Sequence, residues 1–111
     1  MPQDHFAKVL LAAIDEGLSS LGDSPRQAIL YHLEASFQLK KNDIPKNLTG
    51  FKQALERIFG AGAPYIEKII AQSFYAKLGL DFQEVQDTDL VLSVSDAKRR
   101  IVHAGEVKID E

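Results

Sequence analysis

The strongest constraint on the fold is a block of helix start and stop signals that extends from Gly17 to Leu80. Within it, serine, proline and glycine residues stand where helices are expected to begin or end. Apolar residues recur between these signals at steps of three and four. None of these serine, proline and glycine residues belongs to a reactive cluster. The block therefore predicts a fold far better than it predicts an activity.

The first expected helix covers residues 3–21. Gly17 lies inside it at a cost of about 1 kcal/mol relative to alanine, so we expect a close contact with another helix there. Gly22 is expected to end the helix in a left-handed conformation. The apolar face of this helix consists of Phe6, Val9, Leu10, Ala13, Ile14, Leu18 and Leu21.

A second helix is expected from Ser24-Pro25-Arg26-Gln27 to about Lys40. Ser24 can cap the helix, Pro25 suits its first position, and Gln27 can reach back to the Ser24 amide. We therefore expect Ser24→Ala to cost about 1 kcal/mol. The inward residues expected on this helix are Ala28, Ile29, Leu33 and Phe37.

Two further helices are expected after a polar loop, residues 40–49, in which Pro45 discourages helix and Ile44 is the apolar anchor. The third helix runs from about Leu48 or Thr49 to Phe59, and the fourth opens at Pro64 after a glycine-rich turn. Leu78-Gly79-Leu80 predicts a Schellman motif in which Leu80 folds back near Tyr75. The inward residues expected on these two helices are Phe51, Leu55, Ile58, Ile66, Ile69, Ile70, Phe74 and Leu78.

The last segment, residues 88–109, fits two periods. Apolar and polar residues alternate over Leu90 to Ser95 and again over Ile101 to Ile109, which predicts two strands joined by a polar turn at residues 96–99. Steps of four, three and four from Leu90 to Ile101 predict instead a fifth helix, capped by Thr88. We favour the strands because the alternation recurs on both sides of the turn. The expected fold is thus mainly α: a compact bundle of four helices followed by a C-terminal β-hairpin, or, as the alternative, an all-α fold with a fifth helix, in a single domain over residues 3–109.

Composition limits the classes of function. A chain of 111 residues with 45% hydrophobic and 26% charged residues is typical of one globular domain. The absence of cysteine excludes disulfides and thiolate metal sites. The longest apolar run is too short for a signal peptide or a membrane span, so we expect a cytoplasmic protein without a membrane partner.

Nothing in the sequence predicts catalysis. His5, His32 and His103 lie far apart and lack a partner at the spacing of a helical ligand pair. The Gly-x-Ser-x-Gly motif is absent, and the glycine turn at residues 60–63 lacks the lysine of a phosphate-binding loop. We therefore expect no enzyme, no metal, no cofactor and no small-molecule substrate.

Two groups of residues are candidates for partner contacts. Three apolar residues exceed what the helical bundle needs and are expected to contact a protein; they are Leu90, Leu92 and Val94. Six basic residues in two clusters are candidates for contacts with an anion or a nucleic acid. The first basic cluster is Lys40, Lys41 and Lys46, and the second basic cluster is Lys98, Arg99 and Arg100. A net charge of −3 argues against nucleic-acid binding. Four aromatic residues are expected in the core, and any that is exposed would mark a partner face; they are Tyr31, Phe37, Phe74 and Tyr75.

The block over residues 17–80 resembles the archaeal Nitrosopumilus-type output domain. The matching residues are Gly17-Leu18-Ser19-Ser20-Leu21-Gly22, Ser24, Arg26-Gln27-Ala28-Ile29, His32-Leu33-Glu34, Ile44-Pro45, Phe51, Ala54-Leu55-Glu56-Arg57-Ile58-Phe59-Gly60, Gly62-Ala63, Ile66-Glu67 and Tyr75-Ala76-Lys77-Leu78-Gly79-Leu80. The resemblance fades after Leu80. It implies a small helical domain of archaeal signalling proteins, found alone or fused to sensory modules, without established catalytic residues.

We therefore expect a non-catalytic signal-transduction output or protein-interaction module. It would act through apolar surface contacts with a protein partner or with a second copy as a homodimer. The alternative is a transcriptional regulator that binds DNA through the two basic clusters.

Overall fold

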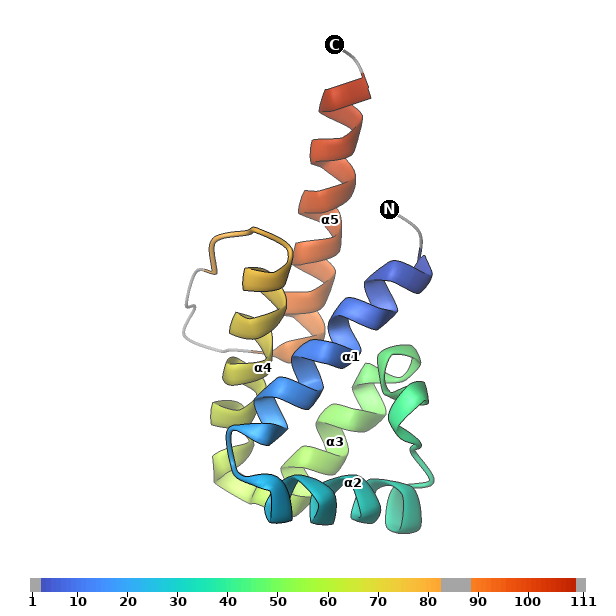
Figure 1. The fold of residues 1–111 in the computed structure, drawn as a ribbon, viewed down its shortest axis with the longest axis vertical. Helices are drawn as coiled ribbons and strands as arrows, with labels where there is room; N and C mark the ends of the chain where they lie inside the picture. Colours follow the sequence, from blue (N-terminus) through green and yellow to red (C-terminus); the bar gives the residue numbers. More distant parts are fainter. Residues whose placement is uncertain (1–2, 83–88, 110–111) are drawn as a thin grey trace.

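The computed structural model describes residues 3–82 and 89–109, with side chains for residues 5–82 and 89–101. This part of the chain folds into five α-helices, shown in Figure 1. They are α1 (Gln3–Ser19), α2 (Asp23–Phe37), α3 (Leu48–Phe59), α4 (Ala63–Lys77) and α5 (Leu90–Ile109). Two short 3-10 helices, η1 (Lys41–Lys46) and η2 (Gly60–Gly62), precede α3 and α4.

Helices α1 and α4 form the most extensive helix pair of the fold, and their contact depends on Gly17. A Cβ atom at Gly17 would lie 2.6 Å from Cγ1 of Ile70 and 3.5 Å from its Cα. Both residues are buried at this crossing. The expected close helix contact at Gly17 is confirmed.

One hydrophobic core receives side chains from all five helices and from η1. The rings of Phe6 on α1 and Phe74 on α4 lie 5.9 Å apart within it. Ile44, the expected anchor of the polar loop, is fully buried. The largest fully buried apolar side chains are Phe51, Phe74, Ile14, Leu18, Leu33, Ile44, Leu55, Ile70 and Leu90.

The end of α4 is a Schellman motif, as predicted. Gly79 has φ 72°, in the left-handed region. The Leu80 N–H donates to the Tyr75 carbonyl at 2.9 Å, and the Gly79 N–H donates to the Ala76 carbonyl at 3.1 Å. Gly22, which separates α1 from α2, has φ 107° and ψ 158°, so its φ is positive but the expected left-handed conformation is not adopted.

The start of α2 differs from the prediction. The helix begins at Asp23, with Gly22 in the cap position and no side-chain cap hydrogen bond. Since the Gly22 carbonyl accepts from the Arg26 N–H at 3.0 Å, the first turn closes two residues earlier than a Ser24 cap would allow. Ser24 is exposed inside this first turn, so the predicted capping role of Ser24 is wrong. The helix ends at Phe37 rather than near Lys40, because Gln38 adopts a left-handed conformation with φ 54°.

The C-terminal segment is helical, so the predicted β-hairpin is wrong and the all-α alternative describes the fold. Leu90, Val94 and Ala97 lie on one face of α5 and are at most 3% exposed, whereas Leu92 is 67% exposed. A strand would have placed Leu92 on the same face as Leu90 and Val94. Burial against α3 and α4 therefore favours the helical period. Thr88, the expected cap, lies outside the described residues.

The molecule is elongated, with principal extents of 48 × 29 × 22 Å. The C-terminal half of α5 forms one end of the long axis in Figure 1. Helix α2 and the start of α4 form the opposite end. None of the helices in the described part of the chain is long and apolar enough to cross a membrane.

Candidate functional site

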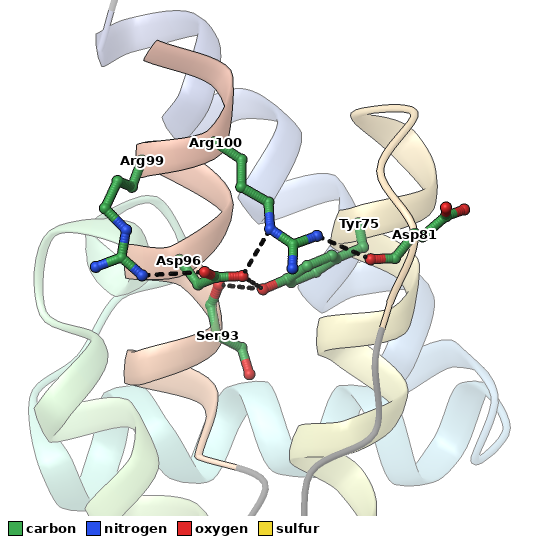
Figure 2. A network of polar contacts seen from close by, with 6 residues as sticks. All are labelled: Tyr75, Asp81, Ser93, Asp96, Arg99 and Arg100. Atoms are coloured by element: carbon green, nitrogen blue, oxygen red, sulfur yellow. Dashed lines mark hydrogen bonds and ion pairs between the residues drawn. The ribbon is translucent and has the colours of Figure 1, made fainter. Parts of the chain in front are cut away.

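Two arginines of the second basic cluster are held by one carboxylate (Figure 2). Arg99 Nη2 lies 3.0 Å from Asp96 Oδ1, and Arg100 Nε lies 3.2 Å from Asp96 Oδ2. Arg100 Nη1 also donates to the Asp81 carbonyl at 3.1 Å. Each guanidinium thus has an intramolecular partner, although the Arg99 side chain remains 76% exposed.

The same carboxylate joins α5 to α4 through Tyr75. The Tyr75 hydroxyl lies 2.7 Å from Asp96 Oδ2 and 2.9 Å from the Ser93 carbonyl, so its proton serves these two acceptors. Burial and the hydrogen bond to Asp96 raise the pKa of Tyr75 to about 12. The hydrogen bond from Tyr75, with that from Arg99, holds the pKa of Asp96 below its ordinary value. Tyr75 thus keeps its proton and Asp96 its charge, which makes the network a stable tie between two helices.

Of the remaining basic candidates, two side chains have an intramolecular partner and two have none among the described residues. Lys98 Nζ lies 5.5 Å from the centroid of the Phe6 ring, and Lys41 Nζ lies 3.2 Å from Asp15 Oδ1. Lys40 and Lys46 are exposed and have no ion-pair partner among the described residues. Four of the six predicted anion contacts therefore have intramolecular partners, which disfavours a continuous DNA-binding surface.

Glu67 is a buried carboxylate that the sequence analysis did not single out. Its side chain is 2% exposed, and its Oε1 accepts from the Leu90 N–H at 3.1 Å. Burial raises the pKa of Glu67, while the Leu90 N–H and Lys52 oppose the rise. The signal was present in the sequence, because Glu67 precedes Ile70 by three positions and so falls in the apolar stripe of α4. Its role is to satisfy the first backbone donor of α5.

The predicted apolar contact residues separate in the structure. Leu90 and Val94 are core residues, at 0% and 3% exposed, and their burial removes them from the candidate surface. Leu92 stays on the surface at 67% exposed. Two of the three apolar residues of this segment therefore pack α5 against the core.

Two tyrosines are the most exposed aromatic residues of the described chain. Tyr31 on α2 is 74% exposed and Tyr65 in the first turn of α4 is 65% exposed. Of the four aromatic residues expected in the core, Phe74 and Tyr75 are buried and Phe37 is half-buried, so Tyr31 is the exception. Tyr31 follows the buried Ile29 by two residues, which is about 200° around a helix. This spacing in the sequence predicts that Tyr31 lies on the face opposite Ile29.

The residues one helical turn from each tyrosine include small uncharged side chains and one charged side chain, Glu34 beside Tyr31 and Lys68 beside Tyr65. Ala28 and Ala35, one turn before and after Tyr31, are exposed, which corrects the expected inward position of Ala28. The exposed neighbours of Tyr65 include Ala61 and Pro64. Because α2 and the start of α4 lie at the same end of the long axis (Figure 1), we call this set the tyrosine end. It comprises Ala28, Tyr31, Ala35, Ala61, Pro64 and Tyr65.

Comparisons with protein-family models, curated proteins and solved structures found no match. Within the described residues, no group of three or more histidine, aspartate or glutamate side chains is placed to hold a metal ion. His5 and His32 are exposed, and the side chain of His103 lies outside the described residues. The tyrosine end is the candidate functional site because it holds the two most exposed aromatic side chains of the described residues.

Proposed function

We propose that this protein is a non-catalytic interaction module of the signalling-output class and that it contacts its partner through the tyrosine end. The observation that carries the proposal is the exposure of Tyr31, a large aromatic side chain between two exposed alanines on α2. Tyrosine contributes a large apolar contact area and a hydroxyl that can form a hydrogen bond. For this reason it is enriched at protein interfaces.

The small residues beside Tyr31 suit contact with another helix or a flat surface. Alanine lets a neighbouring backbone approach closely, and removing water from the uncharged Ala28, Tyr31 and Ala35 costs little. The exposed Glu34, one turn after Tyr31, adds a negative charge at the edge of this surface. Leu92 is a weaker candidate because it is a single apolar side chain on a helix whose exposed face also carries Lys98 and Arg99.

The role in signalling is proposed from the resemblance of residues 17–80 to the archaeal output domain, for which the comparison with family models gave no match. All residues of the tyrosine end lie within residues 17–80. The proposal extends to a protein partner or a second copy of the chain. The DNA-binding alternative has no comparable support, since Asp96 pairs with both Arg99 and Arg100.

Site-specific photocrosslinking tests this proposal. The photoreactive residue p-benzoylphenylalanine is placed at Tyr31, Tyr65 or Leu92 in otherwise unchanged chains, which are expressed in the native host and irradiated. We expect a discrete covalent product from positions 31 and 65 and none from position 92. Equal products from all three positions, or none from positions 31 and 65, would refute the proposal.

Light scattering of the purified chain then identifies the partner class. A homodimer is expected to dissociate in Tyr31→Ser and to persist in the control Leu92→Ser. If the wild-type chain is a monomer, the product at position 31 must have a mass other than twice that of the chain.

A further inference from the structure

A small pocket lies where the end of α2 meets the start of α3. Its volume is about 220 Å³, and it is lined by Phe37, Leu39, Asn47, Gly50, Gln53 and Arg57. Phe37 and Leu39 provide an apolar part, whereas Asn47, Gln53 and Arg57 provide polar side chains. The tyrosine end includes none of these residues, so inferences about this pocket do not rest on the proposed function.

Arg57 differs from the other arginines of the chain. Arg26 pairs with Asp15, and Arg99 and Arg100 pair with Asp96. Among the described residues, Arg57 has neither an ion pair nor a side-chain hydrogen bond. Its planar guanidinium is thus available to bind a carboxylate with two parallel hydrogen bonds.

The residues next to the lining residues in the sequence carry a net positive charge, because Glu56, which precedes Arg57, pairs with Lys52 at 3.3 Å. Lys40 follows Leu39 and Lys46 precedes Asn47, and both lysines are exposed and unpaired in the described structure. No acidic residue lines the pocket. Asn47 Oδ1 already accepts from the Gly50 N–H at 3.1 Å, so the Asn47 amide nitrogen is left as a donor. These groups favour a negatively charged ligand.

We propose that this pocket binds a carboxylate carried on an apolar group about the size of one amino-acid residue. Arg57 would hold the carboxylate, and Phe37 and Leu39 would contact the apolar group. The volume is below the range of about 300–1,000 Å³ that is usual for drug-sized ligands, which limits the ligand to this size. The C-terminal residue of a peptide and a free small acid share this chemistry.

Nuclear magnetic resonance titration of the whole chain tests the site. N-acetyl-leucine is the probe, and N-acetyl-leucinamide, which lacks the carboxylate, is its matched control. We expect saturable shifts of the Leu39, Gly50 and Gln53 amides with a Kd of about 1 mM, in keeping with the small size of the probe. The amide control should bind at least tenfold more weakly.

Two charge variants separate this site from general attraction to anions. Arg57→Gln is expected to weaken binding at least tenfold, whereas Lys8→Gln removes another exposed cation and should leave the Kd unchanged. Equal weakening by both variants, no saturation, or equal binding of the amide would overturn the proposal.

The same titration distinguishes the two sources of the ligand. A hexapeptide with a C-terminal leucine is compared with its C-terminal amide. Tighter binding of the free peptide than of N-acetyl-leucine supports the site and assigns the ligand as a peptide terminus. Equal Kd values support the site and assign it as a free acid, while equal binding of the peptide and its amide contradicts it.

Discussion

At the residue scale, the position that allows α1 and α4 to approach most closely is Gly17. An added Cβ would lie 2.6 Å from Cγ1 of Ile70, and Ile70 is fully buried. A β-branched side chain in a packed core has few other rotamers available, so the neighbour cannot readily move away. The helix propensity lost at this glycine is therefore offset by packing.

We predict that Gly17→Ala destabilises the protein. Overpacking costs about 1–3 kcal/mol, and the gain in helix propensity returns at most about 1 kcal/mol. With the full gain subtracted, the expected net loss is up to about 2 kcal/mol in the free energy of unfolding, measured with urea. Gly62→Ala is the control, because its added Cβ would lie 3.8 Å from Phe59 Cβ, an ordinary contact. A Gly17→Ala protein as stable as this control would contradict the packing argument.

A second prediction at this scale concerns the pH dependence at Glu67. Because burial raises the pKa of Glu67 in the folded state, ionisation of this group costs stability. The cost is absent below the ordinary value, 4.5, and grows as the pH rises through the folded pKa. Glu67→Gln keeps an oxygen that can accept from the Leu90 N–H but carries no charge. We expect the stability of Glu67→Gln relative to wild type to be higher at pH 7 than at pH 4.

Urea unfolding of both proteins at the two pH values measures this difference. Glu34→Gln serves as the control, since Glu34 is an exposed carboxylate on α2. A relative stability of Glu67→Gln that does not change with pH would show that the buried carboxyl does not ionise with a raised pKa.

At the element scale, the starts of α5 and α2 differ in whether a side chain caps the helix. Asp89 Oδ1 accepts from the Val91 N–H at 2.9 Å and from the Leu92 N–H at 3.3 Å, so Asp89 caps α5. Asp89→Ala should therefore cost about 1 kcal/mol. Ser24→Ala should change stability by less than about 0.5 kcal/mol, because Ser24 caps nothing and is exposed. Equal midpoints of urea unfolding for the two variants would refute this assignment of the caps.

The elements also show which parts of the fold were predictable. Helices α1, α3 and α4 were predicted nearly to their ends, because each has a long apolar stripe and a glycine or proline at a boundary. The start of α5 was not predicted as a helix. Leu90, Leu92 and Val94 are spaced by two residues, as in a strand, but Leu90 and Val94 are also spaced by four residues, as on one face of a helix. Over five residues the patterns overlap, and the contact with α3 and α4 decides between them.

The candidate sites were less predictable than the helices. Tyr31 is outward because Ile29 and Leu33 set the buried face of α2, a choice that depends on which neighbours are present. Arg57 differs from the other three arginines only in the folded structure, where each of those has an acidic partner. Exposure and pairing are properties of the assembled chain, and residue spacing alone does not specify them.

At the scale of the whole molecule, α5 belongs to the same core as the other helices. Leu90, Val94 and Ala97 join the single cluster of buried apolar residues, and Tyr75 and Glu67 tie α5 to α4 by hydrogen bonds. Loss of α5 would expose the buried faces of its neighbours. Unfolding of α5 should therefore be coupled to unfolding of the rest.

We predict a single cooperative transition that a change in α5 shifts as a whole. Leu90→Ala should reduce the free energy of unfolding by about 2–5 kcal/mol, because it leaves a cavity at a fully buried position. Far-UV circular dichroism reports all helices and near-UV circular dichroism reports the packing of the buried tyrosine and phenylalanine rings, Tyr75 among them, so both signals should give the same lowered urea midpoint. The control Leu92→Ala, at an exposed position on the same helix, should change stability by less than about 0.5 kcal/mol. Two separate transitions in Leu90→Ala, with the near-UV signal lost first, would show instead that α5 is a detachable element.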